Sequence, residues 1–232
     1  MRTGWILFLS FIVFYATEHN ALANVVLMIG DSHTVGEFGQ RLHDDIATLP
    51  NVNIASYGSW GSSPSWWRDG TATNYELREW DLAGDRELLT GTNPTPLLST
   101  LVAQTNPSVI VVALGANLLG SPADWIDQSI QNLMDEAHSD AQTCLWIGPP
   151  SMRQNGSGKI LNDSDYAAVY DSLKSHASAD GCLLIDSYAI THYPAVGGDG
   201  MHYDYIPNIG LTLADNWADQ VFNDLKTAIG YY

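Results

Sequence analysis

Basic residues are scarce in this sequence. It has 9 Lys and Arg against 26 Asp and Glu, so its formal net charge at pH 7 is −17. Such a chain repels nucleic-acid phosphates and anionic lipid head groups. The composition therefore argues against nucleic-acid binding and against a basic membrane-docking surface. A small neutral molecule or a glycan fits this charge better as a substrate.

Cysteine is scarcer still, with two residues, and no CxxC, CxxH or HExxH spacing occurs. We therefore predict no zinc site, no other metal and no cofactor. The two cysteines, Cys144 and Cys182, each begin a short apolar run. If these runs are neighbouring parallel strands, the two sulfur atoms start side by side at one end of the sheet. We expect a disulfide in an oxidising compartment, and the alternative is two buried thiols.

Long apolar runs are missing after residue 23. At the N-terminus, Arg2 precedes an apolar run over residues 5–15, and the small-residue ending Ala21-Leu22-Ala23 follows. These features predict a secretory signal peptide over residues 1–23, cleaved before Asn24. The run is shorter than the roughly 20 residues that cross a bilayer, which disfavours a membrane anchor. We expect an exported monomer, periplasmic or extracellular, without stable membrane insertion.

Short apolar runs alternate with segments of helical spacing. This alternation predicts βαβ units with right-handed crossovers, and so a three-layer α/β/α domain with a mainly parallel sheet over residues 24–232. The predicted strands lie at 25–29, 52–56, 109–114, 144–147 and 182–185, and the predicted helices at 35–49, 125–137, 163–179 and 215–229.

The stretch from residue 62 to residue 100 fits this scheme poorly. It is rich in Gly, Pro, Trp and charged residues and is longer than an ordinary connection, so we interpret it as an active-site insertion or lid. The tryptophans in and beside it either stack on sugar rings or pack in the core and the lid, and both readings stay open. They are Trp60, Trp66, Trp67 and Trp80.

The first apolar run leads directly into Gly30-Asp31-Ser32. Parallel sheets place their chemistry at the carboxyl ends of strands, although a serine there is also a common helix N-cap. A serine nucleophile needs a base, and Asp199 and His202 are spaced so that one turn presents both side chains. His33 is a competing base, but adjacent side chains diverge. The other histidines considered, which we interpret as ordinary residues, are His138, His176 and His192.

A serine hydrolase also needs donors for the oxyanion. The backbone N–H of Ser32 is available at the start of a helix. Asn117 follows the third predicted strand and can offer its side-chain amide at the same edge of the sheet. A third donor would be a backbone N–H in the loop after the second strand, at Gly58 or Gly61, because glycine allows a close approach to substrate.

Four short motifs occur in one order: Gly30-Asp31-Ser32, a loop glycine, Gly115-x-Asn117 and Asp199-x-x-His202. Each is weak alone, but the ordered set spans nearly all of residues 24–232 and resembles the SGNH (GDSL-type) hydrolase family. The resemblance implies a flavodoxin-like sheet of five strands in the order 2-1-3-4-5. The G-x-S-x-G elbow of α/β-hydrolases does not surround the serine.

The resemblance also implies roles for single residues. Ser32 is then the nucleophile, His202 the general base and Asp199 the residue that orients it, while Ser32, Gly61 and Asn117 form the oxyanion hole. The family often carries N-x-G-x-x-G around its donor glycine, and here Ser56 replaces the asparagine, so Gly58 remains the alternative donor. The run Gly-Asp-Ser-His-Thr is similar to that of bacterial peptidoglycan O-acetylesterases.

These motifs predict acyl transfer through a Ser-His-Asp triad. We expect a secreted serine esterase that removes O-acetyl or other short acyl groups from a carbohydrate or from peptidoglycan. A lipase or lysophospholipase and a sugar O-acetyltransferase are the alternative enzymes. A glycan-binding module without catalytic activity is the alternative from a different class.

Overall fold

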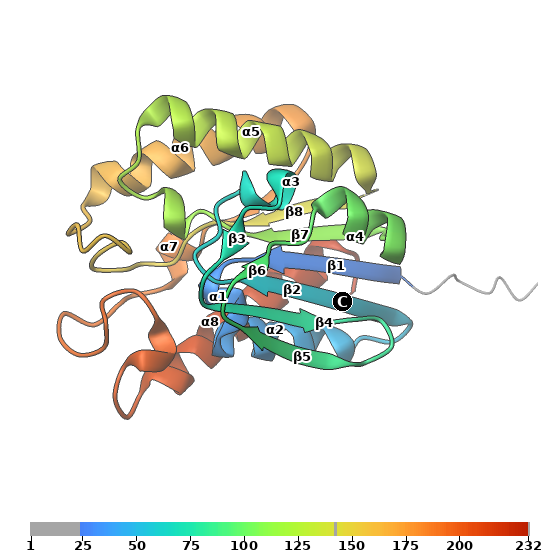
Figure 1. Cartoon of the computed structure of the whole chain (residues 1–232), viewed down its shortest axis with the longest axis horizontal. Helices are drawn as coiled ribbons and strands as arrows, with labels where there is room; N and C mark the ends of the chain where they lie inside the picture. The colour runs from blue at the N-terminus through green and yellow to red at the C-terminus, as the bar shows by residue number, and fades with distance from the viewer. Residues whose placement is uncertain (1–23, 142, 232) are drawn as a thin grey trace, which may run out of the picture.

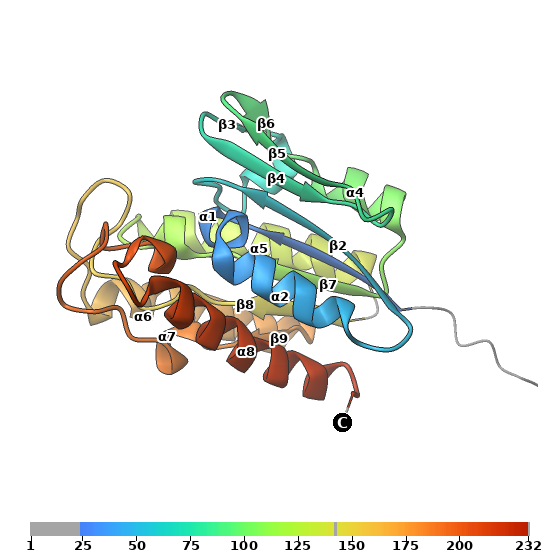
Figure 2. The same cartoon turned by 90° about the horizontal axis from the view of Figure 1, so that it is seen from below.

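The computed structural model describes residues 24–141 and 143–231, so the predicted signal peptide lies outside the described residues. A central sheet is enclosed by two helical layers (Figures 1 and 2). One face is covered by α2 (Glu37–Ala47) and α8 (Gly210–Ala228). The other face is covered by α4 (Leu98–Thr105), α5 (Ala123–Asp140) and α6 (Asp163–Asp180). The predicted three-layer α/β domain with a mainly parallel sheet is therefore confirmed.

Five parallel strands form the body of the sheet and arise from the five apolar runs. They are arranged side by side as β2-β1-β7-β8-β9. Such strands are covered on both faces, which explains why their sequences are nearly continuous apolar runs. Their bounds are β1 (Asn24–Gly30), β2 (Val52–Ser59), β7 (Val109–Ala113), β8 (Thr143–Ile147) and β9 (Leu183–Ile185).

The prediction of a sheet with only five strands is wrong, because the sheet has seven in the order β5-β4-β2-β1-β7-β8-β9. β4 (Glu76–Trp80) and β5 (Arg86–Thr90) form a hairpin that pairs antiparallel with β2. All five residues of β5 are exposed, so no apolar pattern marks this strand in the sequence. The segment 62–100 therefore widens the sheet.

The remaining elements are short and lie mostly in loops. The segment 62–100 also contains α3 (Trp66–Asp69) and a two-stranded antiparallel sheet of β3 (Ala72–Thr73) and β6 (Asn93–Pro94). The others are α1 (Ser32–Val35), η1 (Ala116–Leu118), α7 (Ser187–Ile190) and η2 (Tyr203–Tyr205). Within the described part of the chain, no helix combines the length and the apolar character needed to cross a membrane.

The strand β1 contributes to two separate cores. Leu27 and Ile29 pack into the core beneath α5 and α6, whereas Val26 and Met28 pack into the core beneath α2 and α8. This alternation follows from the two-residue period of a strand. All four side chains are fully buried. The turn that follows β1 is therefore held by packing on both faces of the sheet.

The predicted disulfide between Cys144 and Cys182 is confirmed. Leu145 of β8 pairs with Leu183 of β9, so the cysteines immediately before this pair also lie side by side. Their Cα atoms are 4.7 Å apart. The bond joins the strands at the edge of the sheet where the parallel strands begin.

Removing this disulfide is expected to destabilise the fold. The bond links residues 38 positions apart, and closing a loop of this size stabilises a fold by roughly 2–4 kcal/mol. The double substitution Cys144→Ala, Cys182→Ala should lower the free energy of unfolding by that amount in urea titrations. An unchanged urea midpoint would contradict the prediction.

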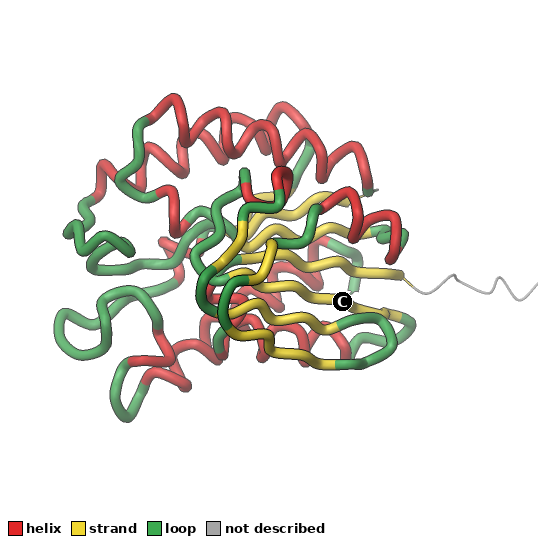
Figure 3. The backbone as a smooth tube through the Cα atoms, viewed as in Figure 1, coloured by secondary structure: helices red, strands yellow, loops and turns green. Residues whose placement is uncertain are grey.

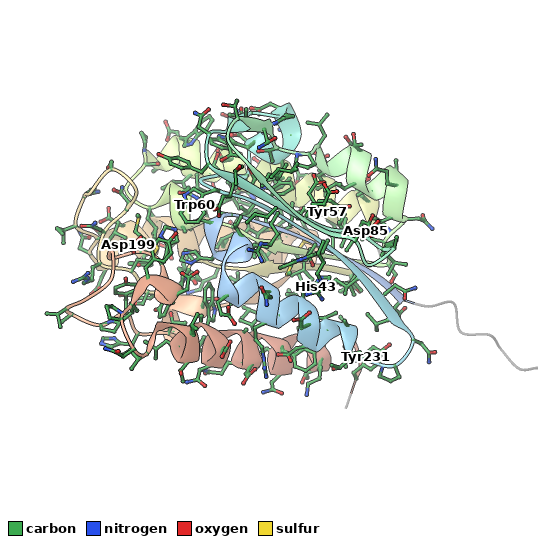
Figure 4. The ribbon with its side chains drawn as sticks, turned by 60° about the horizontal axis from the view of Figure 1, so that its bottom comes forward. His43, Tyr57, Trp60, Asp85, Asp199 and Tyr231 are labelled. Carbon is green, nitrogen blue, oxygen red and sulfur yellow. A yellow bond between two sulfur atoms is a disulfide. The ribbon has the colours of Figure 1, made fainter. Side chains whose placement is uncertain are left out.

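The two ends of the described chain lie close together. The side-chain amide of Asn24 donates a hydrogen bond to the hydroxyl of Tyr231 (3.3 Å), and this hydroxyl donates to the carbonyl of Pro50 (3.1 Å). Tyr231 is labelled in Figure 4. Because Asn24 begins β1, these contacts lie at the edge of the sheet where the parallel strands start.

Candidate active site

The candidate site lies at the edge of the sheet where the parallel strands end. Figure 3 shows long loops gathered at this edge. Ser32 lies two residues after the end of β1, and Asp199 and His202 lie in the loop that precedes α8. In Figure 4, Asp199 and Trp60 lie toward the same end of the molecule, away from Tyr231. The topology thus brings together residues from the first and the last part of the chain.

Ser32 is placed by the turn between β1 and α1. The carboxylate of Asp31 caps α1 by accepting a hydrogen bond from the N–H of His33 (3.0 Å). Ser32 is the first residue of this short helix and is 7% exposed. Its own N–H makes no hydrogen bond to any other described residue. The serine therefore presents both its hydroxyl and a free backbone donor at the end of β1.

A chain of hydrogen bonds connects Ser32, His202 and Asp199. Nε2 of His202 lies 2.9 Å from Oγ of Ser32, and Nδ1 lies 2.5 Å from Oδ2 of Asp199. The other carboxylate oxygen of Asp199 accepts the N–H groups of Met201 and His202, both at 2.8 Å. Burial raises the pKa of Asp199, but the hydrogen bonds from the His202 ring and these N–H groups outweigh it, so the net pKa is lowered. An ionised Asp199 keeps the proton of the imidazole on Nδ1.

The loop that carries Asp199 and His202 is fixed at Gly200. The N–H of Gly200 donates to the hydroxyl of Tyr193 (3.0 Å), and Tyr193 in turn donates to the carbonyl of His202 (3.2 Å). Gly200 has φ +89°, and a Cβ added there would lie 2.8 Å from Cγ of Gln154. Only glycine is accommodated without strain in this conformation.

Arg153 holds the same loop from a second side. Its N–H donates to the carbonyl of Gly200 (2.8 Å), and its guanidinium donates to the carbonyls of Ala195 (2.8 Å) and Gly197 (2.6 Å). The guanidinium also lies 5.4 Å from the centre of the Tyr193 ring. Sequence reasoning missed both Arg153 and Tyr193, because neither belongs to a short motif.

The three predicted oxyanion donors line one cavity of about 310 Å³ together with His202. The side-chain amide of Asn117 donates one hydrogen to the carbonyl of Ser62 (2.9 Å), which leaves its second hydrogen available. The N–H of Gly61 makes no hydrogen bond to another described residue. Ser32, Gly61 and Asn117 thus bring two free backbone donors and one amide to the same cavity.

Gly58, the alternative donor, has a different environment. It lies within β2, pairs with Gly30 of β1 and is not among the residues that line the cavity. A Cβ added to Gly58 would lie 2.8 Å from the backbone nitrogen of Val35. This glycine therefore allows α1 to pack closely against β2, and Gly61 is the better placed donor.

His33, the competing base, points toward aromatic neighbours. Its ring lies 5.4 Å from that of Trp217, edge-on, and 5.5 Å from that of His202. Burial lowers the pKa of His33 to about 3, and the nearby His202 adds to the effect, so the ring is neutral at pH 7. Its imidazole makes no hydrogen bond to Ser32 in the described chain, whereas His202 does.

The histidines outside the site have ordinary surroundings. His43 is buried with Nδ1 2.7 Å from the hydroxyl of Ser56, and Nε2 of His176 lies 2.9 Å from the carboxylate of Asp127. Across residues 24–141 and 143–231, no three His, Cys, Asp or Glu side chains are grouped so as to hold a metal ion.

The four tryptophans of this region lie in different environments. Trp67 and Trp80 are 0% and 3% exposed. They pack in the interior, so the interpretation that they stack on sugar rings is wrong. Trp66 is half-buried in α3. Only Trp60 lines the cavity beside Ser32, with its ring centre 4.6 Å from that of His202.

Asp31 makes the stability of the fold depend on pH. Burial raises the pKa of Asp31 to about 7, and the hydrogen bond from the N–H of His33 only partly offsets this. A carboxyl with a raised folded-state pKa stabilises the fold below its unfolded pKa of about 4 and loses that contribution as pH rises to 7.

The substitution Asp31→Asn should therefore increase the free energy of unfolding, relative to the parent protein, more at pH 8 than at pH 4. Asparagine keeps the cap but cannot ionise, so its advantage over the parent protein should grow between these pH values by up to about 4 kcal/mol. Urea titrations of both proteins at pH 4 and pH 8 measure this difference. The other titratable groups are the same in both proteins, so their contributions to the pH dependence cancel. An advantage that does not change with pH would contradict the prediction.

No family model and no curated protein sequence matches this chain. Solved structures resemble it. A putative arylesterase from Agrobacterium tumefaciens is 16% identical, with a TM-score of 0.59 over 88% of this chain and 99% of that chain. A lipase/acylhydrolase from Enterococcus faecalis is 15% identical, with a TM-score of 0.53 over 87% of this chain and 96% of that chain. An aryl esterase from M. smegmatis is 12% identical, with a TM-score of 0.55 over 89% of this chain and 100% of that chain. At these identities the likeness shows the fold alone: the chain has the fold of structures named as arylesterases and as a lipase/acylhydrolase.

Proposed function

We propose that this protein is a serine esterase of the SGNH type. The observation that carries the proposal is the hydrogen-bonded chain from Asp199 through His202 to Ser32. Ser32 and His202 are 170 residues apart in the sequence. They meet because of the fold and not because they are close in the chain. The similarity to structures named as arylesterases and acylhydrolases supports the same conclusion.

The triad geometry suits acyl transfer. Nε2 of His202 accepts the proton of Ser32 while Oγ of the serine attacks the ester carbonyl. The imidazolium then gives this proton to the departing alcohol oxygen, which leaves an acyl-serine. Water, deprotonated by His202, attacks the acyl group, and the proton returns to Oγ as the acid is released. Asp199 stabilises the imidazolium in both steps.

The negative charge of each tetrahedral intermediate needs donors that are already in place. We assign this role to the N–H groups of Ser32 and Gly61 and to the side-chain amide of Asn117. The bond from Asn117 to the carbonyl of Ser62 supports the assignment, because it ties the amide to the loop that carries Gly61.

We propose that the acyl group is acetyl or a similarly short chain, carried by a carbohydrate or by peptidoglycan. Besides the triad and the oxyanion donors, the residues that line the cavity near Ser32 are His33, Trp60, Tyr75, Ala116, Met152, Gly156 and Met201. Among them Ala116, Met152 and Gly156 give a small apolar surface that suits a short chain. The net charge of −17 favours an uncharged ester over an anionic phospholipid.

We further propose that the protein is exported, with residues 24–232 forming a single hydrolase domain that acts as a monomer. The Cys144–Cys182 disulfide supports an oxidising compartment. One chain supplies all three triad residues and the oxyanion donors, so the site needs no second copy. Mass spectrometry of the protein from its native cells should give a chain that begins at Asn24.

Hydrolysis of p-nitrophenyl esters from acetate to palmitate tests the proposal. We expect the highest kcat/KM for acetate or butyrate, with no turnover above background for Ser32→Ala. A preference for long chains would favour a lipase. Transfer of acetate to a sugar without release of free acetate would favour an acetyltransferase. No turnover of any ester would overturn the enzyme proposal.

A further inference from the structure

A second cavity opens beside the one that contains Ser32. It has a volume of about 270 Å³ and shares Trp60 and Tyr75 with the first cavity. The other residues that line it are Glu76, Thr90 and Tyr205. The proposed mechanism uses none of these five side chains. A substrate bound at Ser32 can therefore extend from the first cavity into the second over the shared aromatic surface.

Two of the aromatic rings in this second cavity are exposed. Tyr75 is 66% and Tyr205 is 53% exposed, and their ring centres lie 6.2 Å and 6.3 Å from that of Trp60. Trp60 itself is fixed by its backbone, because its N–H donates to the carbonyl of Glu76 and its carbonyl accepts from the hydroxyl of Thr73, both at 2.9 Å. Trp60, with its backbone held in place beside two exposed tyrosine rings, is suited to bind the apolar face of a ligand.

The position of His202 identifies the part of the substrate that this surface would bind. In acyl transfer the histidine gives its proton to the departing alcohol oxygen, so the alcohol lies on the side of His202. The ring centres of Trp60 and Tyr205 lie 4.6 Å and 5.3 Å from that of His202. The aromatic surface is therefore on the alcohol side of the ester.

The polar groups around the aromatic surface are acidic or neutral. Glu76 lines the second cavity and Asp199 the first, and none of the described residues that line either cavity is a lysine or an arginine. Carboxylates accept hydrogen bonds from hydroxyl groups but repel carboxylates and phosphates. The surface thus matches an alcohol with an apolar face and several uncharged hydroxyls, which describes a neutral pyranose ring.

We propose that Trp60, Tyr75 and Tyr205 form a subsite for a neutral sugar ring on the alcohol side of the cleaved ester, with Glu76 and Thr90 as hydrogen-bonding partners. The assignment to the alcohol side rests on the proposed esterase function. Trp60 stacks on the ring next to the ester, while Tyr75 and Tyr205 extend the contact outward. Glycans with a charge close to the ester, such as acetylated galacturonans, are disfavoured.

Sugar binding can be measured separately from catalysis. The binding of xylohexaose, a neutral oligosaccharide, to the Ser32→Ala protein is followed by calorimetry, with a galacturonate hexamer as the charged probe of equal length. The same titrations are repeated with Tyr75→Ala and Tyr205→Ala added together. The matched control is Trp125→Ala, which removes a ring on α5 that is 46% exposed and lies outside both cavities. Hydrolysis of acetylated xylo-oligosaccharide and of ethyl acetate is measured in parallel with Ser32 intact.

We expect xylohexaose to bind and the galacturonate hexamer to bind at least tenfold more weakly. Loss of both tyrosine rings should weaken xylohexaose binding by tenfold or more, whereas Trp125→Ala should leave it unchanged. The ratio of kcat/KM for acetylated xylo-oligosaccharide to that for ethyl acetate should fall by a similar factor in the double variant.

The outcomes separate this proposal from the proposed function. If esters are hydrolysed but xylohexaose does not bind, or binds equally well without the two rings, the subsite is overturned and the esterase stands. If no ester is hydrolysed while xylohexaose binds through the two rings, the esterase fails and the sugar site stands. Equal affinity for the charged hexamer would overturn the assignment to a neutral sugar.

Discussion

Replacing Ser32 with alanine is expected to lower kcat for short-chain esters by about 10⁵–10⁶-fold, the range found when a triad nucleophile is removed. The reason is that Oγ of Ser32 is the atom that forms the acyl bond, and His202 has no other hydroxyl within hydrogen-bond distance among the described side chains. Stopped assays with p-nitrophenyl acetate over several hours measure the residual rate.

Two controls make the result for Ser32 specific. Ser139→Ala removes a hydroxyl from an exposed position on α5 and should keep full activity. The thermal midpoint of Ser32→Ala should stay within a few degrees of the parent, since the substitution removes one small polar atom. If Ser32→Ala retained one per cent of the parent kcat, the serine would not be the nucleophile.

Asp199→Asn is expected to lower kcat by about 10⁴-fold at pH 7–8, as in other triads in which the carboxylate becomes an amide. The asparagine oxygen can still accept the N–H groups of Met201 and His202, but its NH₂ then faces Nδ1 of His202. Nδ1 becomes the acceptor and the ring proton moves to Nε2. In this tautomer His202 cannot accept the proton of Ser32.

The measurement is kcat for acetate esters as a function of pH, with Asp171→Asn as the control. Asp171 is an exposed carboxylate on α6, so its replacement changes the net charge equally but leaves the site intact. The control should match the parent protein. If Asp199→Asn were within tenfold of the parent at pH 7, Asp199 would not be the residue that orients His202.

The parallel strands could be predicted from the sequence because most of their residues are buried and each strand appears as a short apolar run. The hairpin of β4 and β5 could not. β4 contributes Leu77 and Trp80 to the interior, but two charged residues separate them, so the strand lacks the two-residue period. β5 is exposed along its whole length. The hairpin joins the sheet through the pairing of β4 with β2, which no pattern in the sequence of the hairpin indicates.

The meeting of Ser32, Asn117, Asp199 and His202 at one edge of the sheet was predictable, because each belongs to a short motif in a loop at that edge. The aromatic surface was only partly predictable. Trp60 has the same residue type as Trp67 and Trp80, which are buried, and no feature of the sequence marks Tyr75 and Tyr205 as exposed rings beside Trp60. Whether an aromatic side chain is buried or exposed depends on packing between distant segments, which a single sequence does not display.

The contact between Asn24 and Tyr231 has a consequence for the order of the chain. β1 spans about 23 Å at 3.3 Å per residue, so these two residues meet on the side of the molecule opposite Ser32. A short peptide could join them, and new ends could be opened in the exposed turn at residues 82–84 between β4 and β5. Such a circular permutant would keep every strand neighbour and all three triad residues in place. Catalysis in this fold is thus a property of which segments pack together and is independent of the order in which the polypeptide connects them.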